Sequence, residues 1–210
     1  MVAQNMDTFD NLENANQAPA DPFALFSNWM AQAEAREPND PNAMALSTVD
    51  ADGMPSVRMV LLKDYDERGF VFYTNGHSRK GDALNANPVA GFCIHWKSLR
   101  RQIRAEGRVE RVSETESDEY FHSRSRESQL AAAASDQSRP LDHYSALETR
   151  VKTLEALYDG TMDIPRPAHW GGYRIIPSRI EFWQDGPHRM HHRVVYTRDG
   201  DIWVRSMLYP

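Results

Sequence analysis

The chain has 210 residues, of which 40% are hydrophobic and 26% are charged. This length predicts one domain, and the composition is ordinary for a soluble globular protein and excludes a wholly disordered chain. The 24 Lys and Arg against 30 Asp and Glu give a formal charge of −6, which repels nucleic acid, and nowhere do the roughly eighteen apolar residues of a membrane span run together.

The first 20 residues are polar and show no hydrophobic periodicity, which predicts a flexible N-terminal arm over residues 1–20. They carry neither the basic start nor the apolar stretch of a secretion signal. Cys93 is the only cysteine, so no intrachain disulfide can form, and it is interpreted as a core residue. These features favour a cytoplasmic protein whose single domain covers residues 21–210.

A helix is expected to begin after Asp21, which can cap it, because Pro22 suits a first turn. Its apolar stripe consists of Phe23, Leu25, Phe26, Trp29 and Met30. Beyond the turn at 38–41, extended runs rich in Val, Ile, Phe and Tyr follow at residues 43–49, 56–63, 69–74, 90–96 and 102–112. Turn signals such as Asp52-Gly53 separate them and predict an antiparallel meander.

Helices are expected to interrupt this sheet. A short one is predicted over 78–85, with Ser78 as its cap, and a helical block over 114–158, with Thr115 as its cap. Strands at 172–183, 189–197 and 202–208 close the chain. This order predicts an α+β fold built on a small antiparallel barrel with peripheral helices.

The first candidate site consists of basic residues at strand and helix ends. Arg58 and Lys63 flank an apolar strand, and burying either charge without an anion would be costly. Arg79 and Lys80 open a helix just after a strand ends, where free backbone N–H groups favour a phosphate. Solvated strand ends and a basic first turn on the surface are the alternatives.

A second candidate site is the set Tyr120, Arg124 and Ser128. Their spacing by four places all three on one face if the helix continues, which suits a second phosphate. Salt bridges to Glu119 or Glu127 are the alternative for Arg124.

A third candidate site lies near the C-terminus, where Arg189, His191 and Arg193 alternate. In a strand all three would point to one face and would repel one another unless they shared an anionic ligand. His188 beside them raises the question of a metal, but no spaced Cys or carboxylate ligands occur, so no metal site is expected. The sequence has no glycine-rich phosphate loop, nucleophile elbow or metalloprotease helix, so the chemistry must come largely from a cofactor.

Nine motifs in this order make the chain from about residue 21 to 210 resemble the pyridoxamine 5′-phosphate oxidase family: 58–63 (RMVLLK), 72–75 (FYTN), 78–80 (SRK), 101–104 (RQIR), 106–111 (EGRVER), 120–124 (YFHSR), 135–138 (SDQS), 170–173 (WGGY) and 180–184 (IEFWQ). The resemblance implies an FMN-binding split β-barrel that forms a homodimer, with FMN at the subunit interface. It implies oxidation of pyridoxamine or pyridoxine 5′-phosphate to pyridoxal 5′-phosphate, with O2 as the electron acceptor.

The resemblance also implies roles for individual residues. FMN would be held by Arg58, Met59, Val60, Leu61, Tyr73, Thr74, Arg79, Lys80, Gln102, Gln137, Ser138, Trp183 and Arg193. The substrate phosphate would be held by Lys63, Tyr120, Arg124 and Ser128. Arg189 and His191 would lie over the substrate ring as substrate-binding and catalytic residues.

Three departures from the family pattern stand beside this resemblance. His192 occupies a position where the family commonly has Asp, the segment 130–134 lacks the family's Trp, and the arm lacks a basic, tyrosine-containing stretch. Two other hypotheses are a non-catalytic protein that binds FMN or pyridoxal phosphate, and a split-barrel flavin reductase. The reductase would need no second phosphate site.

Overall fold

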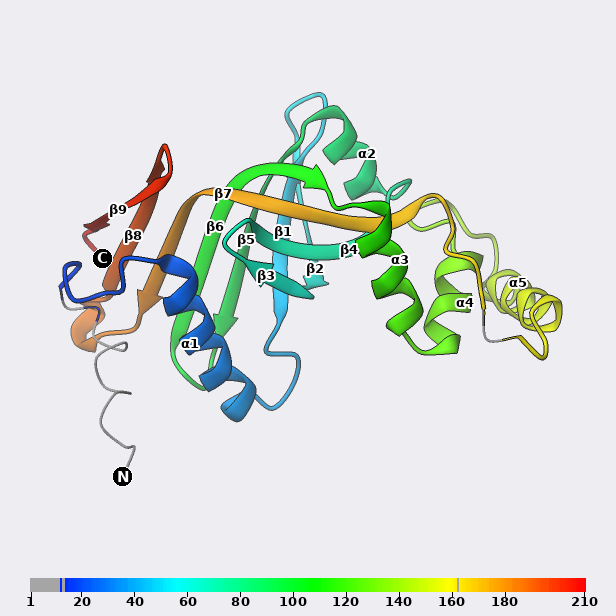
Figure 1. Ribbon diagram of the computed structural model, residues 1–210, viewed down its shortest axis with the longest axis horizontal. Coiled ribbons are helices and arrows are strands. Elements are labelled where there is room, and N and C mark those ends of the chain that lie inside the picture. The colour runs from blue at the N-terminus through cyan, green and yellow to red at the C-terminus, as the bar shows by residue number, and fades with distance from the viewer. Residues whose placement is uncertain (1–11, 13, 162) are drawn as a thin grey trace.

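Figure 1 shows the computed structural model, which describes residues 12, 14–161 and 163–210. The helices are α1 (Pro22–Arg36), α2 (Arg79–Ala86), α3 (Glu114–Ser123), α4 (Arg126–Ala134) and α5 (Tyr144–Leu157). The strands are β1 (Ala43–Val49), β2 (Pro55–Leu61), β3 (Asp64–Asp66), β4 (Gly69–Asn75), β5 (Val89–Trp96), β6 (Arg101–Arg111), β7 (Trp170–Gln184), β8 (His192–Asp199) and β9 (Ile202–Met207). The predicted α+β fold is confirmed.

The strands form one curled antiparallel sheet in the order β2-β1-β5-β6-β7-β4-β3, with β8 on β7 and β9 on β8. The long β7 holds this sheet together, because β4 pairs with its first half and β8 with its second half. A bulge between Glu106 and Gly107 bends β6 against it. Gly107 is required there, since a Cβ at this position would lie 1.9 Å from the Ile176 carbonyl oxygen.

Helix α1 packs across the curl of the sheet and supplies much of the core (Figure 1). The Asp21 side chain accepts a hydrogen bond from the Phe23 amide, so the predicted cap is confirmed. Phe26 and Trp29 are fully buried, and Trp29 meets Phe182 of β7 edge to face with ring centroids 5.3 Å apart. Each such side chain contributes about 1.5–3 kcal/mol through burial, so α1 fastens the two halves of the sheet.

The structure differs from the flexible arm that the sequence predicts over residues 1–20. Residues 1–11 and 13 lie outside the described residues, but Leu12 and Ala18 are buried in the core. The Tyr196 hydroxyl donates to the Pro19 carbonyl at 2.8 Å. The described end of the arm is therefore held by apolar burial and a hydrogen bond to β8.

The helical block expected over 114–158 is divided into α3, α4 and α5. Its cap is Ser113 and not Thr115, because Ser113 and Glu116 form a reciprocal capping box. Arg124 is extended and ends α3, and Ser125 caps α4. The helix does not continue from Tyr120 to Ser128, so the condition for a single helical face through Tyr120, Arg124 and Ser128 is not met. No helix within the described ranges is long and apolar enough to cross a membrane.

Candidate active site

A cavity of about 1110 Å³ opens between β2, β4, α2, α3, α4 and the loop at 135–138. It brings together most of the residues predicted from the sequence: Arg58, Met59, Val60, Leu61, Lys63, Tyr73, Thr74, Arg79, Lys80, Tyr120, Arg124, Ser128, Gln137 and Ser138. Residues that had not been predicted for the site also line it, namely Ser56, Val57, Asn75, Ser125, Ala131, Ala132, Ser135 and Trp170. Of these, Asn75, Ser135 and Trp170 lie within the motifs that carry the family resemblance.

Lys80 is a buried cation that lines this cavity. Its Nζ lies 2.9 Å from both Thr74 Oγ1 and Gln137 Oε1, and 3.2 Å from Ser78 Oγ. All of these are neutral oxygens, and no described carboxylate forms an ion pair with Lys80. Burial, with a smaller contribution from the charge of Arg58, lowers the pKa of Lys80 to about 8. The Lys80 ammonium is therefore held by neutral groups, and a bound anion would neutralise its charge.

Arg58 lies on β2 near this lysine, and neutral oxygens hold its guanidinium in place as they hold the Lys80 ammonium. Its Nη1 donates to the Leu46 carbonyl at 3.0 Å and to Thr48 Oγ1 at 2.9 Å, and its Nη2 donates to Ser56 Oγ. Burial and the nearby charge of Arg79 lower the pKa of Arg58. Arg79 is the first residue of α2, whose unpaired amides add positive potential. This arrangement is suited to a phosphate.

A second cationic region of the cavity is built around Arg124. Its guanidinium carbon lies 4.9 Å from the centroid of the Trp170 ring, and its Nη1 is buried with no hydrogen-bond partner among the described residues. Burial lowers the pKa of Arg124. A buried donor without a partner is costly, and an anionic ligand would satisfy it.

Three aromatic rings form the wall behind Arg124. Tyr73 and Tyr120 stack with centroids 3.9 Å apart, and Trp170 lies 5.5 Å from Tyr73 at an interplanar angle of 13°. This wall connects β4, α3 and the start of β7. Although α3 ends at Ser123, the side chains of Tyr120, Arg124 and Ser128 all line the same cavity.

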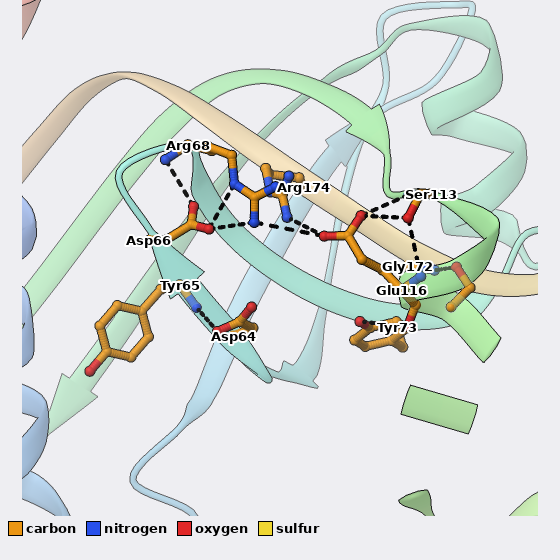
Figure 2. A network of polar contacts seen from close by, with 10 residues as sticks. Asp64, Tyr65, Asp66, Arg68, Tyr73, Ser113, Glu116, Gly172 and Arg174 are labelled. Atoms are coloured by element: carbon orange, nitrogen blue, oxygen red, sulfur yellow. Dashed lines mark hydrogen bonds and ion pairs between the residues drawn. The ribbon is translucent and has the colours of Figure 1, made fainter. Parts of the chain in front are cut away.

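A polar network fixes α3 against the sheet and so positions Tyr120 and Arg124 (Figure 2). Glu116 accepts hydrogen bonds from Ser113 and from the nearly buried Arg174 of β7, the latter at 2.9 Å. The Tyr73 hydroxyl donates to the Glu116 carbonyl at 3.4 Å. Hydrogen bonds from Ser113 and Arg174 lower the pKa of Glu116 against the opposing effect of burial.

The other predicted site residues form a separate C-terminal cluster: Gln102, Trp183, Arg189, His191 and Arg193. Gln102 pairs with Trp183 and Trp183 with Arg193 across β6, β7 and β8, and the Trp183 and His191 rings are 4.7 Å apart. None of the five lines the cavity. The cavity residue Trp170 begins β7 and Trp183 lies near its end, so at roughly 3.3 Å per residue the 15-residue strand keeps them far apart in one subunit.

One prediction about this C-terminal cluster was wrong. Arg189 does not alternate with His191 and Arg193 along a strand, because it lies in the short 3-10 turn Pro187–Arg189, and β8 begins only at His192. Arg189 has a φ of 65°, in the left-handed region. Pro187 and the close approach of Gly186 to the Met190 carbonyl produce this turn.

Glu181 holds Arg193 in this cluster. The carboxylate is buried and accepts from Arg193 Nε at 2.9 Å and from Arg104 at 2.6 Å. Burial alone would raise the pKa of Glu181, but the hydrogen bonds from the two arginines outweigh it and lower this pKa. Within the described part of the chain, no three His, Cys, Asp or Glu side chains gather in a way that could hold a metal ion.

Comparison with known proteins identifies the family. Residues 30–158 match the family model "Pyridoxamine 5′-phosphate oxidase", and residues 170–210 match "Pyridoxine 5′-phosphate oxidase C-terminal dimerisation region". Curated relatives named pyridoxine/pyridoxamine 5′-phosphate oxidase are 62% identical in Gluconobacter oxydans (91% of this chain, 95% of the relative) and 58% identical in Caulobacter vibrioides (90% and 85%).

Solved structures agree with this identification. The crystal structure of PhzG from Burkholderia lata, in complex with tetrahydrophenazine-1-carboxylic acid, has a TM-score of 0.87 at 32% identity and covers 100% of this chain and 98% of its own. A pyridoxamine 5′-phosphate oxidase-related, FMN-binding protein from Nostoc punctiforme shares the fold with a TM-score of 0.71 at 18% identity, over 88% and 97% of the two chains. The two family-model matches and the curated relatives establish that the chain belongs to the pyridoxamine 5′-phosphate oxidase family.

Proposed function

We propose that this protein oxidises pyridoxamine 5′-phosphate and pyridoxine 5′-phosphate to pyridoxal 5′-phosphate with FMN as its cofactor. O2 is the electron acceptor and is reduced to H2O2; with the amine substrate, water hydrolyses the imine that oxidation produces, so that ammonia leaves. We assign the enzyme to vitamin B6 synthesis or salvage in the cytoplasm. The observation that carries the proposal is the presence of two separate cationic regions in one cavity, around Lys80 and around Arg124, without carboxylate partners among the described residues.

The region around Lys80 fits the phosphate of FMN. Lys80, Arg58 and Arg79 provide three positive charges, and Thr74 adds a hydroxyl beside them. Gln137 and Ser138 provide polar groups, and residues 59–61 of β2 line the same cavity. When bound there, FMN supplies the acceptor for a hydride from C4′ of the substrate and passes the electrons to O2.

The region around Arg124 fits the phosphate of the substrate. Arg124 and Lys63 supply the charge, and Tyr120 and Ser128 supply hydroxyl groups. Two phosphate sites in one cavity would position the cofactor and the substrate next to each other, which would convert their encounter into a positioned step. The aromatic wall behind Arg124 excludes water from that side of the cavity and strengthens its electrostatic attraction for the phosphate.

We further propose that each active site combines the cavity of one subunit with the C-terminal cluster of its partner in a homodimer. The length of β7 separates these two groups within a subunit, and residues 170–210 match the family's dimerisation region. Gln102, Trp183 and Arg193 of the C-terminal cluster then complete the FMN site. Arg189 and His191 orient the substrate ring and stabilise the charge that develops on it, and neither is an obligatory base.

Anaerobic mixing of the flavin-loaded protein with each B6 phosphate tests this function. The flavin absorbance is expected to bleach within the turnover time, and admission of O2 is expected to restore it and to yield pyridoxal 5′-phosphate. Tight binding of both phosphates with no bleaching would instead identify a binding protein. Bleaching by a nicotinamide donor alone would identify a flavin reductase.

A further inference from the structure

We propose that Gln129 is a positioning residue for Arg124, because its buried side-chain amide holds the backbone from which the guanidinium enters the cavity. The proposal rests on the proposed function in one respect, the role of Arg124 in binding the substrate phosphate. Gln129 is outside the residue assignments made from the sequence, and it is not one of the residues that line the cavity.

The break between α3 and α4 is the place where such a residue is needed. Helix α3 ends at Ser123, and Arg124 follows it in an extended conformation with φ −78° and ψ 157°. Helix α4 begins after Ser125, whose side chain caps it. The carbonyl groups at the end of a helix have no partner within that helix. The Arg124 carbonyl therefore lies in the gap between two helices.

Gln129 reaches back from α4 to this carbonyl. Its Nε2 donates to the Arg124 carbonyl at 2.9 Å and to the His122 carbonyl at 3.5 Å. Gln129 is only 6% exposed, so water has little access with which to replace these hydrogen bonds. A side chain of α4 thereby closes the end of α3.

This hydrogen bond helps to set the direction in which the Arg124 side chain leaves the backbone. The Arg124 amide donates to the Phe121 carbonyl at 3.3 Å, while the Arg124 carbonyl accepts from Gln129. Peptide groups are planar, so holding the one on each side of Cα fixes φ, ψ and the Cα–Cβ direction. The guanidinium carbon then lies 5.9 Å from the centroid of the Phe121 ring and 4.9 Å from that of Trp170.

The two polar atoms of the Gln129 amide have opposite effects on stability. Its Oε1 is buried with no hydrogen-bond partner among the described residues, which is unfavourable, whereas its Nε2 holds Arg124. Methionine has a similar shape and carries neither atom. A change to Met therefore removes the hydrogen bond to Arg124 without leaving a cavity, and so separates a role in the site from a role in packing.

The test compares Gln129→Met with Leu130→Met in the full-length, flavin-loaded protein. Leu130 is the buried neighbour of Gln129 on α4 and has no polar side-chain atom, so its substitution controls for altered packing. Gln129→Met should raise the KM for pyridoxine 5′-phosphate about 3- to 10-fold, as for the loss of one hydrogen bond. Its kcat should stay within about twofold of the wild type and FMN should remain bound. Leu130→Met should keep the wild-type KM.

Two further measurements distinguish positioning of Arg124 from a general loosening of α4. Arg124→Ala already lacks the guanidinium, so adding Gln129→Met to it should raise KM no further. The nitrogen-15 resonance of the Arg124 side chain, identified by its absence in Arg124→Ala, should shift or broaden in Gln129→Met and stay unchanged in Leu130→Met. A wild-type KM in Gln129→Met, an unchanged resonance, or a KM increase that persists in the Arg124→Ala background would overturn the proposal.

If Gln129→Met fails to retain FMN, Gln129→Asn gives the same comparisons, because it keeps the amide but shortens its reach by one methylene. Loss of FMN from both variants would also count against the proposal. Failure of the proposed function has a different signature. The wild-type protein would then turn over neither B6 phosphate, while the resonance comparison, which needs no substrate, would still give its result.

Discussion

The guanidinium of Arg124 lies 4.9 Å from the centroid of the Trp170 ring, which is itself only 6% exposed. These two residues come from the end of α3 and the start of β7, and the aromatic stack of Trp170 with Tyr73 and Tyr120 holds the ring in place. The Trp170 ring attracts the cation, and Arg124 Nη1 has no hydrogen-bond partner among the described residues. Trp170 is thus a supporting residue of the proposed substrate-phosphate site.

Replacing Trp170 should weaken substrate binding while flavin remains bound. A cation–π contact contributes about 0.5–2 kcal/mol, so Trp170→Leu should raise the KM for pyridoxine 5′-phosphate about 2- to 30-fold. Trp170→Phe keeps an aromatic face and should retain most of the affinity. Steady-state kinetics of the two flavin-loaded variants would check this, and equal KM values in the wild type and Trp170→Leu would contradict the role.

Removing the guanidinium itself should have a larger effect. Arg124→Ala should weaken the binding of either B6 phosphate by about 2–4 kcal/mol, because the phosphate would lose a buried charged partner. FMN affinity should stay near its wild-type value. Lys152→Ala, which removes an exposed cation on α5, is the matched control. An equal loss of FMN and substrate affinity in Arg124→Ala would refute the separation of the two phosphate sites.

Most strands could be predicted from the sequence within two residues, because alternation and turn signals act locally. The short acidic strand β3 was missed, since residues 64–66 show no such pattern. The break between α3 and α4 was also missed. Ser125 can stand inside a helix or cap one, and only the packing of α4 decides between these states.

The family motifs could predict most residues that line the cavity. They could not predict that the site residues fall into two groups, the cavity and the C-terminal cluster, that lie apart in one subunit. The separation of Trp170 from Trp183 follows from the pairing of β7 with three neighbouring strands, which is a property of the whole sheet. The turn at Arg189 was not predicted, for a different reason. The alternation of basic residues resembled a strand, and the signal from Gly186 and Pro187 opposed it.

The low pKa of Lys80 predicts how FMN binding depends on pH. In the free protein Lys80 has a pKa of about 8, so above that pH it loses its proton, and binding the phosphate dianion requires proton uptake. The FMN association constant should fall by up to about tenfold per pH unit above that value. Titrations of FMN and of riboflavin, which has no phosphate, would measure this. The dependence should vanish for riboflavin and for Lys80→Met, and its persistence in Lys80→Met would contradict the assignment.

The network in Figure 2 predicts a pH-dependent contribution to stability. Glu116→Gln would leave the Arg174 guanidinium, whose side chain is 5% exposed, without its carboxylate, and should lower the free energy of unfolding by about 1–3 kcal/mol. Because the pKa of Glu116 is lowered on folding, its contribution is present above pH 4.5, the ordinary value, and is lost as the pH falls through the folded-state pKa. Urea unfolding at neutral and acid pH would measure the difference between wild type and variant, which should shrink in acid. Glu119→Gln, an exposed carboxylate on the same helix, should change little.

A mixed dimer tests the central claim, that the cavity of one subunit works with the C-terminal cluster of the other. Arg124→Ala should inactivate the cavity and Arg189→Ala the C-terminal cluster, so each homodimer should be nearly inactive. A dimer with one subunit of each kind, isolated by two different tags, should regain about half of the wild-type kcat, because one of its two sites would combine an intact cavity with an intact C-terminal cluster. A mixed dimer no more active than its parents would show that both groups act within one subunit and would contradict the composite site.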